Sequence, residues 1–258
     1  PPFGVSMLPP DARHPIVAGM CGRYASPDKE AIVMRWPRIR CGGGCEWKPS
    51  ANVAPTTDVP IVVQARDGQW ELQAARWGLV PAWWTRPAPP ARTFNARAED
   101  AAHKPIWRDA LRTARCLLPA RGWYEWRRNQ LALDAAGREG PQPYFLFCPT
   151  EPVIAFAGVW SLWARPDAAP RPTCALFTCP AAPGIAAIHP RMPAALTPAQ
   201  GARWLDPAAA PDEIAALLAA ARTDLDAHPV STRVNDVRHD APDLTVRVSP
   251  PPAGLFPP

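Results

Sequence analysis

Residues 59–77 read VPIVVQARDGQWELQAARW, and this stretch decides the class of fold. Asp67-Gly68 is a common turn pair for a β-hairpin, and an apolar segment stands on each side of it. The second segment alternates apolar and polar residues from Trp70 to Ala74, as one face of a strand does. The stretch therefore predicts two antiparallel strands, over residues 59–65 and 69–77.

Other short apolar segments also predict strands. They are found at Cys116–Leu118, Tyr144–Phe147, Ile154–Val159 and Cys174–Thr178. Strands and helices do not alternate regularly along the chain, which argues against a doubly wound parallel sheet. A single α+β domain with mainly antiparallel strands and peripheral helices fits this order of elements better.

The predicted helices are short. The first has Ser26 as its N-cap and Pro27 as its first helical residue, and it should end by Trp36-Pro37. Another is predicted from Lys104 to Arg112, and a third begins at Thr197-Pro198. A fourth is predicted from the helical spacing of apolar residues at Ile214, Leu217, Leu218 and Ala221.

The composition limits the classes of protein to which the chain can belong. The chain has 258 residues, of which 47% are hydrophobic, so it can bury a core and is not a disordered chain. Its 37 prolines favour short elements and irregular backbone. A net charge of +5 permits a phosphate-binding surface without demanding one, and 12 tryptophans, most of them expected in the core, could supply faces that stack on bases.

The cysteines point to a reducing compartment. There are 7 of them, irregularly spaced, and neither a signal-peptide pattern nor a long apolar run is present, which predicts a reduced, cytoplasmic protein without a membrane span. Cys41 and Cys45 flank three glycines, but a zinc site would need a second close pair, and Cys174 with Cys179 is a poor candidate. We therefore expect no metal ion and no cofactor.

Four short segments concentrate reactive side chains. They are Met20-Cys21-Gly22-Arg23-Tyr24, Asn95-Ala96-Arg97-Ala98-Glu99, Gly122-Trp123-Tyr124-Glu125-Trp126 and Ile188-His189-Pro190-Arg191-Met192-Pro193. Each alone has an ordinary structural explanation, such as a buried cysteine or a residue that caps a turn. Together they provide a cysteine nucleophile with histidine and glutamate as acid–base partners. A cysteine peptidase, among other enzymes, uses such residues.

The position of Cys21 suggests a different chemistry. If Met20 is the translational start, its removal leaves Cys21 with a free α-amine, whose pKa of about 7.7–8.0 leaves it partly neutral at physiological pH. Amine and thiol on adjacent carbons react with an aldehyde in two steps, since the amine forms an imine and the thiol then closes a five-membered thiazolidine ring.

These segments resemble the SOS response-associated peptidase (SRAP) family, from Met20 to about Val248. The resemblance includes Asn52-Val53-Ala54-Pro55, Trp77-Gly78-Leu79-Val80-Pro81, the Asn95, Gly122 and His189 segments above, and His228-Pro229-Val230-Ser231. It implies a single α+β domain around a barrel-like set of antiparallel strands. It also implies a monomeric sensor that crosslinks to abasic sites in single-stranded DNA through an N-terminal cysteine, with possible peptidase and lyase-like activity.

The resemblance implies a role for each site residue. Cys21 would be the crosslinking nucleophile and Asn95 would orient the opened sugar. Glu125 would be the general acid–base, and His189 would help to open the sugar ring and shuttle protons.

The resemblance further implies a set of DNA contacts. The three arginines in the motifs would contact DNA phosphates, because a guanidinium group binds two phosphate oxygens at once. The tryptophan pair lies in a loop that looks like the family's base-stacking wedge, and two further residues would line the site where the strand kinks. The expected DNA-binding residues are Arg23, Arg97 and Arg191, then Trp83 and Trp84, then Asn52 and Pro55, and also Thr178.

Two features depart from the family's pattern. Pro190 stands where the family usually has aspartate, which removes a backbone donor and restricts His189 to extended geometry. Residues 1–19 precede the domain expected at 20–250 and read as a disordered leader, and 251–258 form a proline-rich tail. While the leader is attached, Cys21 has no free amine, so either Met20 is the true start or the leader is removed. The family resemblance implies that the thiol of Cys21 could cut it off.

Two alternatives to the crosslinker remain open from the residues. A cysteine peptidase acting on other proteins needs only a thiolate activated by histidine. A non-covalent binder of single strands would depend on the arginines and tryptophans and would bind intact and abasic strands equally.

Overall fold

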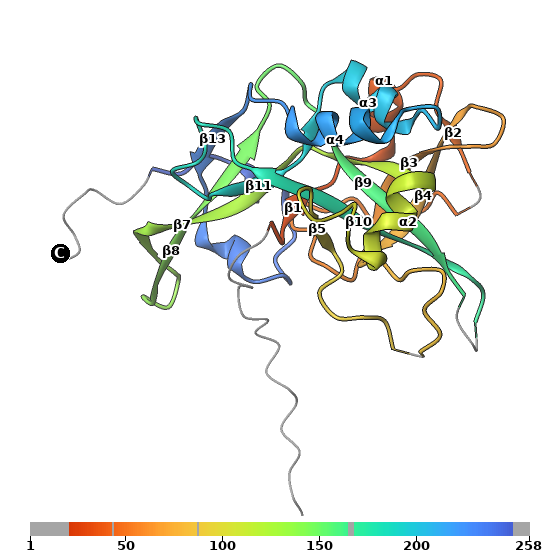
Figure 1. The fold of residues 1–258 in the computed structure, drawn as a ribbon. Coiled ribbons are helices and arrows are strands. Elements are labelled where there is room, and N and C mark those ends of the chain that lie inside the picture. Colours follow the sequence, from red (N-terminus) through yellow and green to blue (C-terminus); the bar gives the residue numbers. More distant parts are fainter. Residues whose placement is uncertain (1–20, 43, 87, 165–167, 250–258) are drawn as a thin grey trace, which may run out of the picture.

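The computed structural model describes residues 21–42, 44–86, 88–164 and 168–249. Two β-sheets lie against each other, and short helices cover the outside (Figure 1). The predicted α+β class with a mainly antiparallel β core is confirmed. The leader and the tail predicted from the sequence lie outside the described residues.

The predicted hairpin is present and is part of a sheet that closes on itself. Strands β3 (Asp58–Gln64) and β4 (Trp70–Trp77) pair in antiparallel register across Gly68, whose φ of 81° suits glycine. From β3 the pairing continues through β6 (Arg115–Ala120), β9 (Ile154–Trp163) and β10 (Arg171–Pro180), and β10 returns to β4. These strands therefore form a ring-like sheet.

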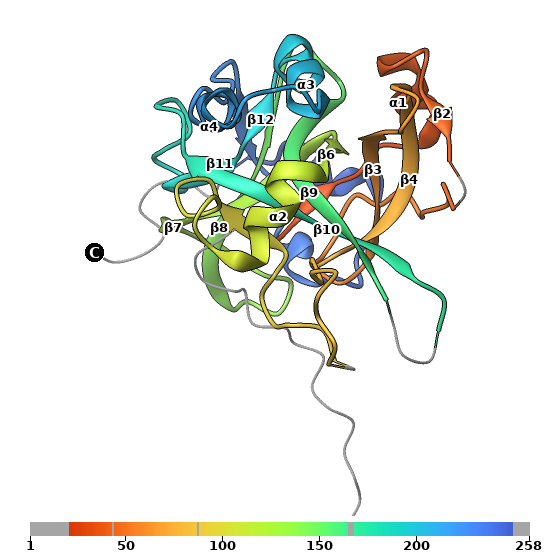
Figure 2. The same ribbon diagram turned by 45° about the vertical axis from the view of Figure 1, so that its right-hand side comes forward.

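Short strands extend this ring-like sheet at its rims. They are β2 (Arg40–Cys41) and β5 (Asn95–Arg97), which join β4 and β10 in parallel, and β11 (Arg191–Pro193) and β12 (Ala195–Leu196), which join β10 and β9 in antiparallel pairs. The few parallel pairs are therefore concentrated on β4 and β10. The rotated view shows β10 running across the ring beside β9 (Figure 2).

The second sheet has the order β1-β7-β8-β13. It contains β1 (Tyr24–Ala25), β7 (Gly122–Leu133), β8 (Glu139–Phe147) and β13 (Asp226–Pro229), all antiparallel. Arg121 alone separates β6 from β7, so one continuous stretch of chain passes from the ring-like sheet into this one. The sequence analysis identified residues 122–126 as a site segment but did not predict the strand that they begin.

The helices are close to their predicted positions. They are α1 (Lys29–Arg35), α2 (Pro105–Thr113), α3 (Pro198–Leu205) and α4 (Pro211–Ala219), followed by the 3-10 turns η1 (Thr232–Asn235) and η2 (Pro242–Thr245). Thr197 caps α3 in a capping box with Gln200, as its sequence suggests.

The prediction of Ser26 as the cap of α1 was wrong. Asp28 is the N-cap and accepts from the Ala31 amide at 2.8 Å. Ser26 is occupied elsewhere, because its hydroxyl oxygen accepts from the Ser50 amide at 3.0 Å and its own amide donates to the Ser50 carbonyl. The contact with Ser50 thus uses the Ser26 hydroxyl that the local sequence favoured as a helix cap.

The core fills the space between the sheets with aromatic rings. Trp77 and Trp123 are fully buried, and Tyr24 packs edge-on against Trp77 at a centroid distance of 5.3 Å. Gly158 lets β9 approach β10 closely, because a Cβ there would lie 2.8 Å from the Ala175 carbonyl oxygen. Among the described residues, no helix is both long and apolar enough to cross a lipid bilayer.

Candidate active site

Strand pairing brings three of the four predicted reactive segments to one place. Cys21 comes just before β1, which pairs with β7 at Tyr24 and Trp123, and β7 carries Glu125. In the ring-like sheet, β5 carries Asn95 and lies beside β10. These pairings position Cys21, Asn95 and Glu125 from residues that are far apart in the sequence.

The fourth segment reaches the same place from the other side of β10. Strand β11, which begins at Arg191, pairs with the last residues of β10. His189 lies just before this strand. We call Cys21, Asn95, Glu125 and His189 the reaction cluster.

Cys21 has partners at both its backbone and its thiol. Its carbonyl oxygen accepts a 2.7 Å hydrogen bond from the Asn95 side-chain amide. Its thiol lies 3.9 Å from the Arg191 carbonyl oxygen and also forms a side-chain hydrogen bond with Glu125. The residue is 2% exposed, so the thiol is buried beside the Glu125 carboxyl group.

Glu125 is a buried carboxyl group with an unusual acidity. Burial raises the pKa of Glu125 to about 8, and a side-chain hydrogen bond with Cys21 opposes the rise. Its Oε1 atom has no hydrogen-bond partner among the described residues, and Nδ1 of His189 is 3.9 Å away. At neutral pH this group is mostly protonated and can either give or take a proton.

Burial also raises the pKa of the Cys21 thiol well above its ordinary value, and the nearby Glu125 adds to the rise. Proximity to Cys179 contributes in the same direction. The thiol is therefore neutral in this state, unlike the activated thiolate of a cysteine peptidase, whose pKa is lowered by a cation.

The His189 ring is oriented by the backbone of Arg191. Nδ1 lies 2.9 Å from the Arg191 carbonyl oxygen and 3.2 Å from its amide nitrogen. A protonated Nδ1 donates to the carbonyl, and an unprotonated one accepts from the amide, so either tautomer keeps the same ring position. The residue at 190 takes no part in these contacts.

Arg191 is almost saturated by protein groups. It forms a two-pronged ion pair with Glu99, with Nη1 to Oε1 at 2.8 Å and Nη2 to Oε2 at 3.0 Å. Nη2 and Nε also donate to Thr178, at its carbonyl oxygen (2.6 Å) and its hydroxyl (3.2 and 3.3 Å). Thr178 is fully buried, so in this state it positions Arg191 and presents no surface of its own.

Arg23 and Asn52 lie in a second buried polar group. The Arg23 guanidinium donates to the Asn52 side-chain oxygen at 3.0 Å and to the Val234 carbonyl at 2.6 Å. The Asn52 amide donates to the carbonyls of Asp236 and His239. We call Arg23 and Asn52, together with the carbonyls they bind on residues 234–239, the anchor cluster.

The remaining predicted DNA contacts lie near the surface. Arg97 is exposed at the end of β5, and Pro55 lines an open groove of about 980 Å³ together with Asn52. Trp83 is 52% exposed, whereas Trp84 is half-buried and donates to the Ala88 carbonyl.

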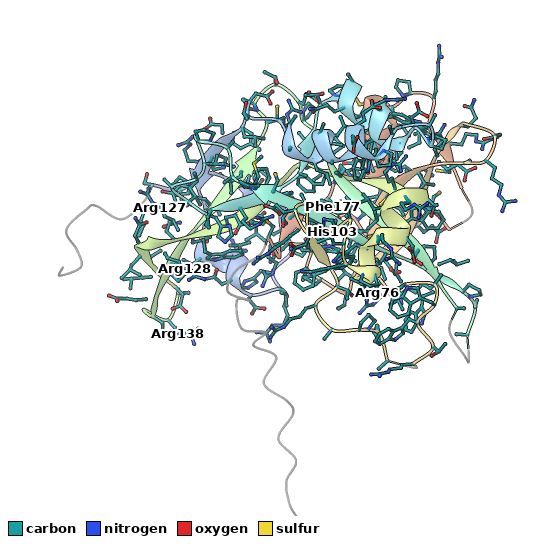
Figure 3. All side chains as sticks on the ribbon, viewed as in Figure 1. Arg76, His103, Arg127, Arg128, Arg138 and Phe177 are labelled. Carbon is teal, nitrogen blue, oxygen red and sulfur yellow. The ribbon has the colours of Figure 1, made fainter. Side chains whose placement is uncertain are left out.

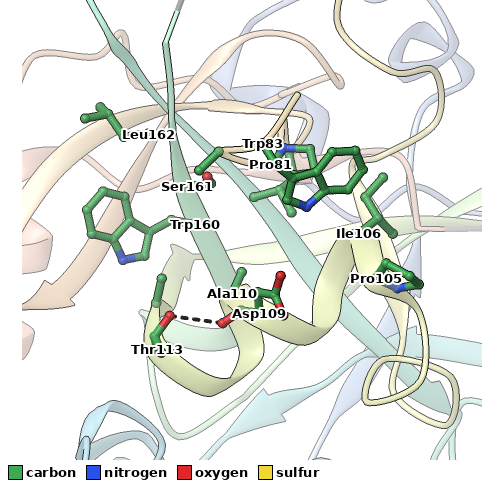
Figure 4. Close-up of a pocket in the computed structure, with 13 residues that line it drawn as sticks. Pro81, Trp83, Pro105, Ile106, Asp109, Ala110, Thr113, Trp160, Ser161 and Leu162 are labelled. Carbon is green, nitrogen blue, oxygen red and sulfur yellow. Dashed lines mark hydrogen bonds between the residues drawn. The ribbon is translucent and has the colours of Figure 1, made fainter. Parts of the chain in front are cut away.

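A separate apolar hollow lies beside the tryptophan loop. It has a volume of about 340 Å³, and Trp83, Ile106, Trp160 and Leu162 are among the side chains around it (Figure 4). Trp83 thus borders this apolar hollow and is also exposed to solvent.

The positive charge of the chain is partly carried by the hairpin of β7 and β8. Arg127, Arg128 and Arg138 project from the outer part of this hairpin (Figure 3). Arg138 is paired with Asp134, whereas Arg127 donates only to the neutral Asn129 side chain. The sequence motifs did not identify this hairpin as a basic surface.

The sequence analysis also gave no role to two neighbours of the reaction cluster. Glu99 belongs to a quoted motif, but its pairing with Arg191 depends on the approach of β5 and β11 to β10. Cys179, the next residue after Thr178, lies close enough to Cys21 to affect its acidity. Neither contact leaves a local pattern from which it could have been predicted.

Comparison with known proteins identifies relatives of the chain. Residues 20–237 match the family model described as SOS response associated peptidase (SRAP). The abasic site processing protein YoqW of Bacillus subtilis strain 168 is 33% identical over 228 residues, which cover 87% of this chain and 98% of YoqW. YedK of Escherichia coli K12 and HMCES of Xenopus tropicalis, which are named in the same way, are 29% and 28% identical.

Coverage and fold agree with these matches. The alignments cover 87% of this chain and 98% of YedK, and 89% of this chain and 78% of HMCES. A crystal structure of a Bacteroides thetaiotaomicron protein has the same fold, with a TM-score of 0.72, 23% identity, and coverage of 89% of this chain and 100% of that one.

Proposed function

The chain belongs to the SOS response associated peptidase (SRAP) family, and on that premise we propose that it processes abasic sites in single-stranded DNA by bonding to them through Cys21. The relatives named as abasic site processing proteins support the substrate. The covalent step, the single-stranded substrate and the roles below are parts of the same proposal, as is action by a cytoplasmic, nucleoid-associated monomer.

One observation carries the proposal. Cys21 is held between Asn95 and Glu125, and each of these buried side chains keeps one oxygen, Oδ1 and Oε1, without a hydrogen-bond partner among the described residues. Leaving a buried acceptor unsatisfied costs about 1–3 kcal/mol, so two of them beside one nucleophile call for a ligand that satisfies both. The C4 hydroxyl of the ring-opened deoxyribose is one suitable donor, and the hydroxyl of the carbinolamine that forms at the aldehyde carbon is the second.

The chemistry takes two steps once Cys21 carries a free amine. The neutral amine attacks the sugar aldehyde, and the carbinolamine loses water to form an imine. The thiol sulfur then bonds to the former aldehyde carbon, the imine nitrogen takes up a proton, and the thiol loses one. The balance is protein plus DNA minus one water, with no oxidant or metal needed.

The acidity of Glu125 suits both steps. With a pKa of about 8, the protonated carboxyl can protonate the departing hydroxyl, and the resulting carboxylate can then accept the thiol proton. The buried and neutral thiol requires such a base, because the pKa of Cys21 is raised in the unreacted protein. We assign to His189 the proton transfers at the sugar oxygen through Nε2, because Nδ1 contacts the backbone of Arg191.

A preceding segment must be removed before this chemistry can occur. We propose that the Cys21 thiol attacks the carbonyl carbon of Met20 and forms a thioester as the amide nitrogen is released. Hydrolysis of the thioester by water restores the thiol and leaves the free amine. This single self-cleavage requires no multiple-turnover peptidase, whose thiolate the acidity of Cys21 does not favour.

Intact-protein mass spectrometry tests the proposal. A chain expressed from Met20 and verified to begin at Cys21 is mixed with an oligonucleotide that carries one abasic site. We expect a denaturation-resistant species with the mass of protein plus oligonucleotide minus water. Cys21→Ser, which keeps the amine, should give only an imine that is lost unless it is reduced by borohydride.

Cys179→Ala is the matched control, because it removes a neighbouring buried thiol and should leave the adduct intact. An N-terminally acetylated protein should form none. Multiple-turnover cleavage of peptides by a protein that forms no adduct would replace the proposal with the peptidase hypothesis. Equal, reversible binding of intact and abasic strands would replace it with the non-covalent binder.

A further inference from the structure

We propose that Arg191 binds a DNA phosphate through the edge formed by Nη1 and Nη2, and that Glu99 occupies this edge as a built-in competitor that the strand must displace. This inference rests on the proposed function, since it assigns a regulating role to a residue beside the same site. Nothing in the family motif or in the names of the relatives gives Glu99 a role.

The first step of the argument is a count of hydrogen-bond donors. A guanidinium group has five N–H donors. In Arg191, one on Nη1 and one on Nη2 go to Glu99, the second on Nη2 goes to the Thr178 carbonyl, and Nε goes to the Thr178 hydroxyl. Among the described residues, the remaining Nη1 donor has no partner.

The second step concerns geometry. A phosphate is bound best by two parallel N–H donors, because its oxygens match the fork of the guanidinium. The edge formed by Nη1 and Nη2 is held by both Glu99 oxygens at 2.8 and 3.0 Å. A phosphate that reached Arg191 in this state would find one donor, so two-pronged binding requires the carboxylate to leave.

The third step concerns exposure. The Arg191 side chain is 16% exposed and is fixed by Thr178, whereas the Glu99 side chain is 49% exposed. Arg191 is therefore the fixed partner and Glu99 the movable one. The hydrogen bond to Arg191 lowers the pKa of Glu99, which keeps it anionic at neutral pH and able to compete with a phosphate.

Displacement links binding to the reaction cluster. The carbonyl oxygen of Arg191 lies 3.9 Å from the Cys21 sulfur and 2.9 Å from Nδ1 of His189. A phosphate that replaces Glu99 would therefore bind through the same residue that orients the nucleophile and the histidine. Competition by Glu99 would weaken the binding of intact strands. The protein could then dissociate from DNA that has no aldehyde with which Cys21 can react.

The test measures reversible binding of an intact single-stranded oligonucleotide by Glu99→Gln. Its matched control is Asp100→Asn, which removes the same charge from the next residue, a carboxylate that pairs with Lys104 and not with Arg191. We expect Glu99→Gln to bind about threefold to tenfold more tightly than Asp100→Asn. Its dependence on salt should also steepen by up to about 0.7 in log–log slope, since no freed carboxylate takes up a cation.

A double-mutant cycle separates competition from a structural role. In an Arg191→Met background, Glu99→Gln and Asp100→Asn should have equal effects on binding, because the contested edge is gone. If Glu99→Gln binds no more tightly than Asp100→Asn in the otherwise wild-type protein, Glu99 positions Arg191 and the inference is wrong.

The same samples distinguish failure of the inference from failure of the proposed function. If Glu99→Gln binds more tightly than Asp100→Asn but no variant forms an adduct with the abasic oligonucleotide, the proposed covalent chemistry is wrong and the competition by Glu99 is supported. An adduct in the wild-type protein with weaker binding by Glu99→Gln would overturn only the competitor. Absence of both strand binding and abasic-site adduct in every variant would overturn both.

Discussion

Cys21 and Arg23 are two residues apart, yet they belong to clusters that differ in how fully their polar atoms are satisfied. In the anchor cluster, the donors of Arg23 and Asn52 reach the carbonyls of residues 234–239 at 2.6–3.3 Å. In the reaction cluster, Asn95 and Glu125 each keep a buried oxygen without a partner among the described residues.

This difference suggests a structural role for the anchor cluster and a role in the proposed reaction for the reaction cluster. A satisfied buried network stabilises one arrangement of the chain, whereas an unsatisfied one stores a cost that a ligand can relieve. The anchor cluster ties the segment after β13 to the strand that follows Cys21, and the reaction cluster keeps two buried oxygens that the proposed substrate would satisfy. Variants in the two clusters should therefore change different quantities.

The largest effect is expected for Glu125→Gln. The amide retains the shape of the side chain but cannot accept a proton, so the rate of adduct formation should fall by about 100-fold to 1000-fold. Quenched-flow or gel assays of the abasic oligonucleotide measure this rate. Glu151→Gln, in the ion-pair network of Arg35 and Arg222, should leave it unchanged.

The same Glu125→Gln variant should be more stable than the wild type at high pH. The folded-state pKa of Glu125, about 8, lies above its ordinary value near 4.5, so the folded protein binds a proton that the unfolded chain releases between these values. Stability contributed at low pH is therefore lost as pH rises from about 4.5 to about 8, by on the order of 5 kcal/mol. Urea unfolding at several pH values should show this slope flattened in the variant, and parallel curves would contradict the assignment.

Arg23→Met should lower the stability of the protein and leave the rate of adduct formation nearly unchanged. Loss of the guanidinium leaves the Val234 carbonyl and the Asn52 side chain without their partner, so the free energy of unfolding should fall by about 2–4 kcal/mol. The adduct rate of the folded variant should stay within about threefold of wild type. A large loss of DNA affinity without loss of stability would instead favour the phosphate contact that the family resemblance implies.

Local signals explain which parts of the fold the sequence predicted. Asp67-Gly68 gives a hairpin because glycine tolerates the positive φ of the turn, and Thr197 gives a helix start because its partner Gln200 is three residues away. The cap of α1 was missed because Ser26 is bound by the distant Ser50. Strand β7 was missed because its polar run from Arg127 to Gln130 interrupts any alternation.

The site shows the same division. Its four reactive residues could be named from motifs, and the structure brings them together through strand pairs that connect distant segments. What could not be predicted was the state of each group: that Arg191 is held by Glu99, that Arg23 is buried, or that Glu125 is mostly protonated at neutral pH. Those states depend on burial and on long-range partners, which no short motif encodes.

The smallest effect is expected for Pro190→Asp, which restores the residue usual in the family. The His189 ring is positioned by the amide and carbonyl of Arg191, and the Pro190 carbonyl accepts from the Ala181 amide, a contact that any residue can make. The rate of adduct formation should therefore stay within about threefold of wild type, with His189→Ala as the reference for a lost ring. A rise of about tenfold or more, equivalent to about 1.4 kcal/mol, would mean that proline holds His189 away from its best position and that the backbone of Arg191 alone does not set the ring.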